Sequence, residues 1–215
     1  AATPPTPQPG RAIRLGVDSG MQQNAQLSFI GSPIVTRQGV FVMATKSGDP
    51  SFVPYYLVRL DRDSGDVSWA CYLCSVSTGA YYFGYSSLAS IPIPTLVDDI
   101  VYIATGQGAD CAVDANVGRI LWLQVTDSAK NTKNPADYYV QREGTAAWKF
   151  NPPMVYGNKL ISYESSGAAT PASGGWLRVY DRWSGQLLTT ATRADLHVGA
   201  ADIVAGISGN KLILT

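Results

Sequence analysis

The chain has 215 residues, and 16 Lys and Arg balance 16 Asp and Glu, so its formal net charge at pH 7 is zero. A general nucleic-acid binder normally carries a basic surplus, and this balance argues against that class. The hydrophobic share of 46% excludes disorder of the whole chain. No apolar run approaches the roughly 20 residues that a membrane-spanning helix needs, so we expect no membrane-spanning segment.

Residues 1–27 form a Pro-rich N-terminal segment that begins with small residues and without methionine. A small-residue start of this kind is typical of a chain whose signal peptide has been removed. We therefore expect an exported protein, located in the periplasm, at the cell surface or outside the cell.

After this segment, a unit made of a short strand, a polar turn and an apolar strand recurs along the chain. Runs of apolar residues bounded by turn residues predict β-strands. The 21 Gly, 13 Pro and 12 Tyr of the whole chain likewise favour strands and turns over helices. The four copies begin at Ser32, Ile93, Pro152 and Asp202.

A second unit, a strand, a tight turn and a returning strand, follows each of the first three copies. In it an Asp is followed four residues later by Gly, and a Trp comes four residues after the Gly. The Asp side chain can accept hydrogen bonds from the turn amides, and the Gly adopts the left-handed conformation that closes the hairpin. The residues are Asp61, Gly65 and Trp69; Asp114, Gly118 and Trp122; and Asp181, Gly185 and Thr189, the last in the tryptophan position.

Together the two units make four antiparallel strands, which repeat at spacings of 61 and 59 residues from Pro33 to Pro94 to Pro153. Repeated four-stranded units predict an all-β fold, a β-propeller in which each blade needs its neighbours to bury its faces.

We assign residues 28–215 to this partial propeller. Its blades are expected at about 32–73, 91–125 and 150–190, with half a blade at 199–215. About three and a half blades make only part of a ring, so we expect further blades from the same gene product or from other protein subunits. The stretch 11–27 is a candidate for a strand that closes such a ring.

The repeat resembles that of the pyrroloquinoline-quinone-type (PQQ-like) propeller family, whose tryptophan-docking motif is Ala-x-Asp-x-x-x-Gly-x-x-x-Trp. The second copy matches fully, at Ala112, Asp114, Gly118 and Trp122. The other copies depart from the motif, with Arg59 in the alanine position of the first and with Val179 and Thr189 in the third.

The resemblance implies a propeller fold and raises the question of quinone-dependent dehydrogenase chemistry. Those enzymes carry adjacent cysteines over the cofactor, a calcium ion held by acidic and amide ligands, and an Asp base. This chain has no adjacent cysteines, and turns explain its repeat Asp residues. We therefore expect no cofactor and no catalytic, cofactor-binding or metal-binding residue.

The three cysteines are Cys71, Cys74 and Cys111, of which the first two form a Cys-x-x-Cys pair. The pair follows a predicted strand, whereas a redox motif is expected at a helix start, and a second pair that would complete a zinc site is missing. A local disulfide, a link to Cys111 and buried thiols all remain open. An odd count leaves one thiol free or paired with another chain.

Insertions lengthen the blades at 46–55, 75–90, 126–149 and 164–175, and function on a repeat scaffold usually resides in such loops. Tyrosine suits interfaces because it combines contact area with a polar tip. The candidate interaction residues are Tyr55, Tyr56, Tyr81, Tyr82, Tyr85, Tyr138 and Tyr139.

We therefore predict a non-catalytic binding scaffold that acts through these loops as a subunit of a larger assembly. Two alternatives remain open. The chain is a fragment of a quinone-dependent dehydrogenase whose cofactor lies on blades outside it, or it is a carbohydrate-binding module of the cell surface.

Overall fold

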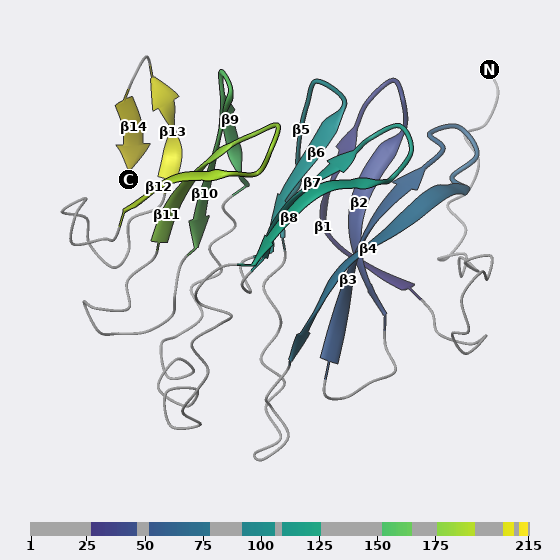
Figure 1. Cartoon of the computed structure of the whole chain (residues 1–215). Coiled ribbons are helices and arrows are strands. Elements are labelled where there is room, and N and C mark those ends of the chain that lie inside the picture. The colour runs from purple at the N-terminus through teal and green to yellow at the C-terminus, as the bar shows by residue number, and fades with distance from the viewer. Residues whose placement is uncertain are drawn as a thin grey trace.

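The computed structural model describes residues 27–46, 52–77, 92–105, 109–125, 152–164, 176–191, 204–208 and 211–214. Within these residues the chain forms three four-stranded antiparallel sheets, which lie side by side as successive blades, and a final two-stranded hairpin (Figure 1). The all-β class and the four-stranded blades predicted from the sequence are confirmed. The described residues contain no helix, and thus none that could cross a membrane.

Each blade uses four consecutive strands, and their order in the sheet is their order in the chain. The first blade contains β1 (Leu27–Val35), β2 (Val40–Lys46), β3 (Phe52–Leu60) and β4 (Val67–Ser77). The second contains β5 (Thr95–Val97), β6 (Ile100–Ala104), β7 (Ala109–Asp114) and β8 (Ile120–Val125). The third contains β9 (Met154–Tyr156), β10 (Lys159–Glu164), β11 (Trp176–Asp181) and β12 (Leu187–Ala191), and β13 (Val204–Ser208) and β14 (Lys211–Leu214) form the hairpin.

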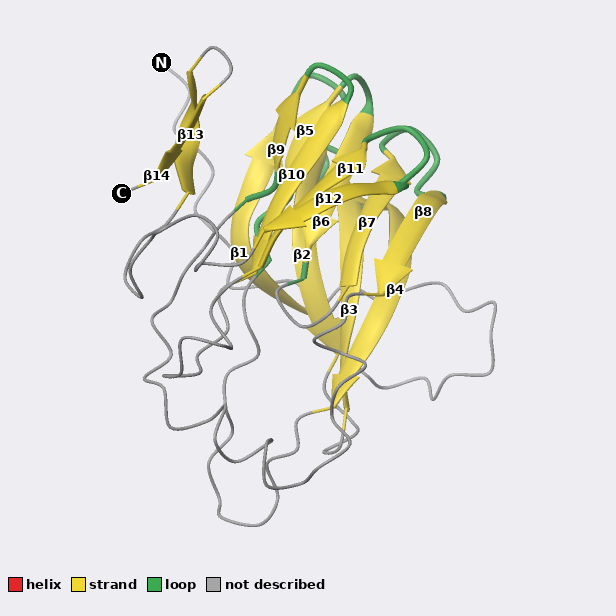
Figure 2. Ribbon diagram, turned by 60° about the vertical axis from the view of Figure 1, so that its left-hand side comes forward, coloured by secondary structure: helices red, strands yellow, loops and turns green. Residues whose placement is uncertain are grey.

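The short turns of all three blades lie at one end of the sheets (Figure 2). This follows from the strand order, because the first and third strands of each blade run toward the same end. The β5–β6 turn consists of Asp98 and Asp99, whose φ angles of 51° and 59° are those of a two-residue hairpin turn. The polar turn that the sequence predicts in the unit beginning at Ile93 is confirmed.

The turn between the two outer strands of each blade has the structure that the Asp-x-x-x-Gly spacing predicts. In the third blade, Asp181 Oδ1 accepts hydrogen bonds from the backbone amides of Trp183 (3.1 Å) and Ser184 (2.9 Å). Gly185 has a φ of 72° and its amide donates to the carbonyl of Asp181 at 2.9 Å. The amide of Ser184 is the main cause that lowers the pKa of Asp181, so the carboxylate stays ionised in this turn.

A β-bulge, which the repeat spacing does not predict, follows the turn in each of the three described blades. In the second blade Ala112 pairs with Trp122 and Val113 pairs with Ile120, which leaves Leu121 without a partner on β7. The same shift leaves Ser68 and Leu188 unpaired in the other two blades. A bulge changes the direction of the side chain that follows it. That side chain is Trp69 in the first blade, Trp122 in the second and Thr189 in the third.

These bulges direct the tryptophans onto the turn of the following blade. A Cβ placed on Gly118 would lie 2.6 Å from Cδ2 of Trp69, and one on Gly185 would lie 2.5 Å from Cδ2 of Trp122. The rings therefore lie directly on backbone that has no side chain. The indole Nε1 of Trp122 also donates to the carbonyl of Arg182 at 2.8 Å. This hydrogen bond fixes the orientation of the ring on the turn.

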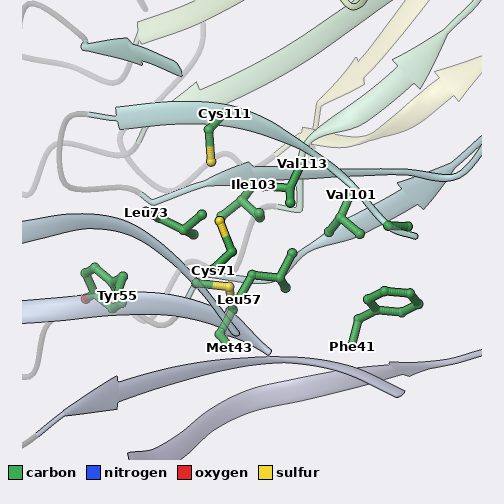
Figure 3. Close-up of a cluster of buried hydrophobic side chains, with 11 residues drawn as sticks. Phe41, Met43, Tyr55, Leu57, Cys71, Leu73, Val101, Ile103, Cys111 and Val113 are labelled. Carbon is green, nitrogen blue, oxygen red and sulfur yellow. The ribbon is translucent and has the colours of Figure 1, made fainter. Parts of the chain in front are cut away.

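The core lies between the blades. A cluster of buried side chains fills the space between the first and second blades, and Figure 3 shows its central members, among them Phe41, Leu57 and Val113. A second cluster, which includes Tyr102, Trp122 and Leu160, fills the space between the second and third. All five residues of β6 are buried, because both of its faces lie against a neighbouring blade.

The contact between tryptophan and glycine yields a test with a matched control. Gly65 has a φ of 74° and Gly185 one of 72°, but a Cβ on Gly65 meets nothing within 4 Å. We expect Gly65→Ala to lower the free energy of unfolding by about 1–2 kcal/mol through backbone strain alone. Gly185→Ala should cost about 1–3 kcal/mol more, because the new methyl group displaces Trp122. Urea unfolding measures both, and equal losses would contradict the docking contact.

Candidate functional site

The two junctions between blades differ in chemistry at equivalent positions. The first junction, between the first and second blades, is filled by apolar side chains and cysteines. The second junction, between the second and third blades, also contains a group of buried residues with polar side chains. They are Asp110 on β7, Ser162 on β10, and Arg178 and Tyr180 on β11, which are 3%, 1%, 5% and 2% exposed.

The carboxylate of Asp110 is the centre of this polar cluster. The hydroxyl of Ser162 donates to its Oδ1 at 3.0 Å, and the hydroxyl of Tyr180 donates to its Oδ2 at 2.8 Å. Nη1 of Arg178 lies 4.0 Å from the same Oδ2. One blade thus supplies a buried carboxylate, and the next supplies two hydroxyl donors and a positive charge.

Asp110 and Arg178 differ from the residues at equivalent positions of the other blades, measured by their distance before the repeat Asp. Asp110 lies four residues before Asp114, where the first blade has Leu57 before Asp61. Arg178 stands three residues before Asp181, a position that Cys111 occupies in the second blade. A charged side chain inside an otherwise apolar strand is the signal by which sequence reasoning could have found Asp110, and it was missed.

The polar cluster lies at the end of the sheets opposite the short turns. Asp110 is the second residue of β7, and Arg178 is the third residue of β11. Both strands begin at that end, and Ser162 lies toward the end of β10, where that strand reaches it. Buried charges are stable only when they are paired and hydrogen-bonded, so the cluster fixes the third blade to the second near these strand ends.

A second set of polar contacts ties the turn end of the same junction. Nη2 of Arg182 donates to Oδ2 of Asp98, across from the third blade to the second. The guanidinium also lies 4.1 Å from the ring centroid of Trp183, whose side chain is exposed. Since the carbonyl of Arg182 accepts from Trp122, one turn residue receives the tryptophan and pairs with the neighbouring blade.

Tyr55 and Tyr56, predicted as loop residues that contact a partner, lie elsewhere. Both belong to β3 and are 0% and 6% exposed, because the strand begins at Phe52 and their rings pack on its two faces. They are core residues of the first blade, and the prediction of an inserted loop at these two positions is wrong. Tyr81, Tyr82, Tyr85, Tyr138 and Tyr139 lie outside the described residues.

All three cysteines lie at the first junction and are free thiols in the structure. Cys71 and Cys74 belong to β4, and Cys111 belongs to β7. Burial raises the pKa of Cys71, raises that of Cys74 to about 11, and raises that of Cys111 well above its usual range. At neutral pH these groups are therefore thiols and not thiolates.

The described residues do not fit a quinone cofactor with its calcium ion. In the three turns, Oδ1 of Asp61, Asp114 and Asp181 already accepts backbone amides. Asp110, the buried carboxylate of the second junction, is held by Ser162 and Tyr180. Across the part of the chain that the structure describes, no three His, Cys, Asp or Glu side chains are grouped so that they could hold a metal ion.

The polar cluster predicts a large penalty for breaking the buried charge pair. Asp110→Leu introduces the residue that the first blade has at this position, but it removes the buried carboxylate that faces Arg178. We expect it to lower the free energy of unfolding by about 3–5 kcal/mol. Arg178→Met in the same chain should recover part of this loss, because it removes the buried positive charge that the carboxylate had faced.

An exposed pair serves as the control. Arg62 and Asp63 form an ion pair of 3.7 Å, and the Asp63 side chain is 93% exposed. Asp63→Ala should change the stability by less than about 1 kcal/mol. If urea unfolding gives Asp110→Leu and Asp63→Ala similar small effects, or if the two changes at the second junction are simply additive, the charge pair does not stabilise the blades.

Comparison with known proteins finds similarity in the fold. No protein-family model and no curated protein matches this sequence. Among solved structures it is similar to a europium-containing methanol dehydrogenase, with a TM-score of 0.51 and 16% identity over 79% of this chain and 27% of that chain. It is also similar to a quinohemoprotein alcohol dehydrogenase from Comamonas testosteroni, with a TM-score of 0.45 and 17% identity over 77% of this chain and 23% of that one.

A third similar structure is BamB from Moraxella catarrhalis, with a TM-score of 0.41 and 12% identity over 74% of this chain and 50% of that chain. The chain thus spans 27% and 23% of the two dehydrogenases and half of BamB. At these identities the similarity concerns the fold alone. The chain is part of a β-propeller.

Proposed function

We propose that this partial propeller is a non-catalytic, exported binding scaffold that belongs to a larger protein assembly. It recognises its partner through the segments inserted between its strands. The observation that carries the proposal is the direction of the described strands. The strand ends that these segments join all lie opposite the short hairpin turns (Figure 2).

The geometry of the blades supports recognition at this end. The facing surfaces of the blades are covered by their neighbours, and the other end is closed by short, internally hydrogen-bonded turns. Loops that a rigid scaffold positions are the usual site of binding. The buried cluster around Asp110 joins the second and third blades near this same end of the sheets.

The sequence of these segments supplies suitable side chains. Tyr81, Tyr82 and Tyr85 lie between β4 and β5, and Tyr138 and Tyr139 lie between β8 and β9. Tyrosine rings provide contact area at low entropic cost, and their hydroxyls can pair with polar groups of a partner.

We favour a scaffold over an enzyme because the acidic side chains of the repeat already accept hydrogen bonds from the backbone of their own turns. The observation on the side of a dehydrogenase fragment is the likeness of fold to a methanol dehydrogenase, at a TM-score of 0.51. A dehydrogenase fragment of this kind would carry its cofactor on blades outside this chain. The two candidates therefore differ in what accompanies the chain in its native state.

Native mass spectrometry of the protein isolated from its source, without added ligands, tests the proposal. We expect the chain in a complex with other polypeptides. The double change Tyr81→Ala and Tyr82→Ala should release at least nine-tenths of the partner and leave the thermal unfolding temperature unchanged. Tyr156→Ala is the control, because this exposed tyrosine lies next to a hairpin turn at the opposite end.

Three results would contradict the scaffold. A single heavier polypeptide that carries a quinone-sized ligand and calcium identifies a dehydrogenase fragment. Retention of the partner after loss of both tyrosines, together with loss of polysaccharide binding, identifies a carbohydrate-binding module. Cell fractionation that finds the native protein in the cytoplasm contradicts export.

A further inference from the structure

The first junction gathers all three thiols of the chain, although they are up to 40 residues apart in the sequence. Cys71 and Cys111 belong to the same buried cluster, and Cys74 packs against it. Figure 3 shows Cys71 and Cys111 extending toward one another from the two blades. The thiols of β4 therefore face the thiol of β7 across the junction.

A second bulge in β4 explains why both members of the Cys-x-x-Cys pair face the same way. Residues three apart on a regular strand point to opposite faces. Here Cys71 pairs with Leu57 and Cys74 pairs with Tyr55, because the register shifts between Tyr55 and Tyr56. Leu57 and Tyr55 both belong to the cluster at the first junction, so the shift places both cysteines on the side of Cys111.

We propose that the first junction is a redox-sensitive cross-link site: oxidation joins Cys111 to one of the two cysteines of β4 and ties the first blade to the second. The remaining thiol stays reduced. The reaction concerns this chain's own residues and stands independently of the proposed binding function.

The oxidant belongs to the class of low-molecular-weight disulfides, of which oxidised glutathione is the probe. Cys74 is the one residue of the three that is only partly buried, so we take it as the first to react with the oxidant. Its thiolate attacks one glutathione sulfur and expels the other half as a thiolate, which forms a mixed disulfide. Cys111, or Cys71 followed by exchange with Cys111, then displaces the second glutathione. Two protein thiols lose two electrons and two protons, and one oxidised glutathione becomes two reduced ones.

Burial sets the rate of this reaction. The pKa of Cys74 is raised to about 11 by burial, so little thiolate is present at neutral pH. Below that pKa the rate of cross-linking should rise about tenfold for each unit of pH, because only the thiolate attacks. A disulfide that closes a loop of about 40 residues should also raise the thermal unfolding temperature of the chain by about 5–10 °C.

The experiment compares the purified full chain after incubation with oxidised glutathione and after incubation with a reductant. Intact mass should fall by about 2 Da, since one disulfide removes two hydrogens. Peptide mapping without reduction should find Cys111 linked to Cys71 or to Cys74. In Cys111→Ala the rise in unfolding temperature on oxidation should disappear, whereas at least one of Cys71→Ala and Cys74→Ala should retain it.

A link between Cys71 and Cys74, glutathione attached to Cys74 without a further step, or three thiols that remain free to alkylation would each overturn the proposal. The peptide map of the unaltered chain decides between these results even if Cys111→Ala fails to fold. Alanine is chosen because a buried free cysteine behaves as a small apolar residue.

Discussion

The packing of a tryptophan ring against a glycine in the turn of the next blade is the contact on which the rest of this structure depends. A blade buried on both faces, as β6 shows, has no stability alone, and each must be held at a fixed angle to its neighbour. Gly118 and Gly185 each leave room for a ring, because any Cβ there would lie within 2.6 Å of indole carbon. The bulge before Trp69 and Trp122 directs the rings onto those turns. The repeat spacing, the turn and the bulge thus all position one contact.

Once this contact fixes the angle between blades, the space between them can be filled in different ways. The first junction departs from the repeat at Arg59, whose Nη1 donates to the carbonyl of Asn116 at 3.2 Å. There the indole Nε1 of Trp69 is buried and meets no hydrogen-bond acceptor among the described residues. The second junction keeps alanine at that position, and its tryptophan Nε1 donates to a carbonyl. The first junction collects the thiols, and the second carries the buried charge of Asp110.

Most of the fold could be predicted because its signals are local and repeat three times. The spacing of Asp61 and Gly65 gives a turn whose hydrogen bonds and φ angle follow from elementary stereochemistry.

What could not be predicted depends on the register between paired strands. A single residue inserted in β4 turns Cys74 to the face of Cys71, and strand periodicity alone would have placed them on opposite faces. Tyr55 and Tyr56 read as loop residues, since a tyrosine pair is compatible with either an exposed loop or a strand buried on both sides. The cluster around Asp110 requires contacts between blades that no single repeat contains.

The measurement that tests the docking contact most directly is hydrogen exchange at the indole N–H groups, followed by NMR. The chain has five tryptophans and thus five such signals, and Trp122→Phe assigns the relevant one. The Nε1 proton of Trp122 is buried and hydrogen-bonded to the carbonyl of Arg182, so it should exchange at least a hundredfold more slowly than that of Trp183, whose side chain is exposed. If the two protons exchange at similar rates in the folded chain, Trp122 does not dock on the third blade, and the account of how the blades are joined fails.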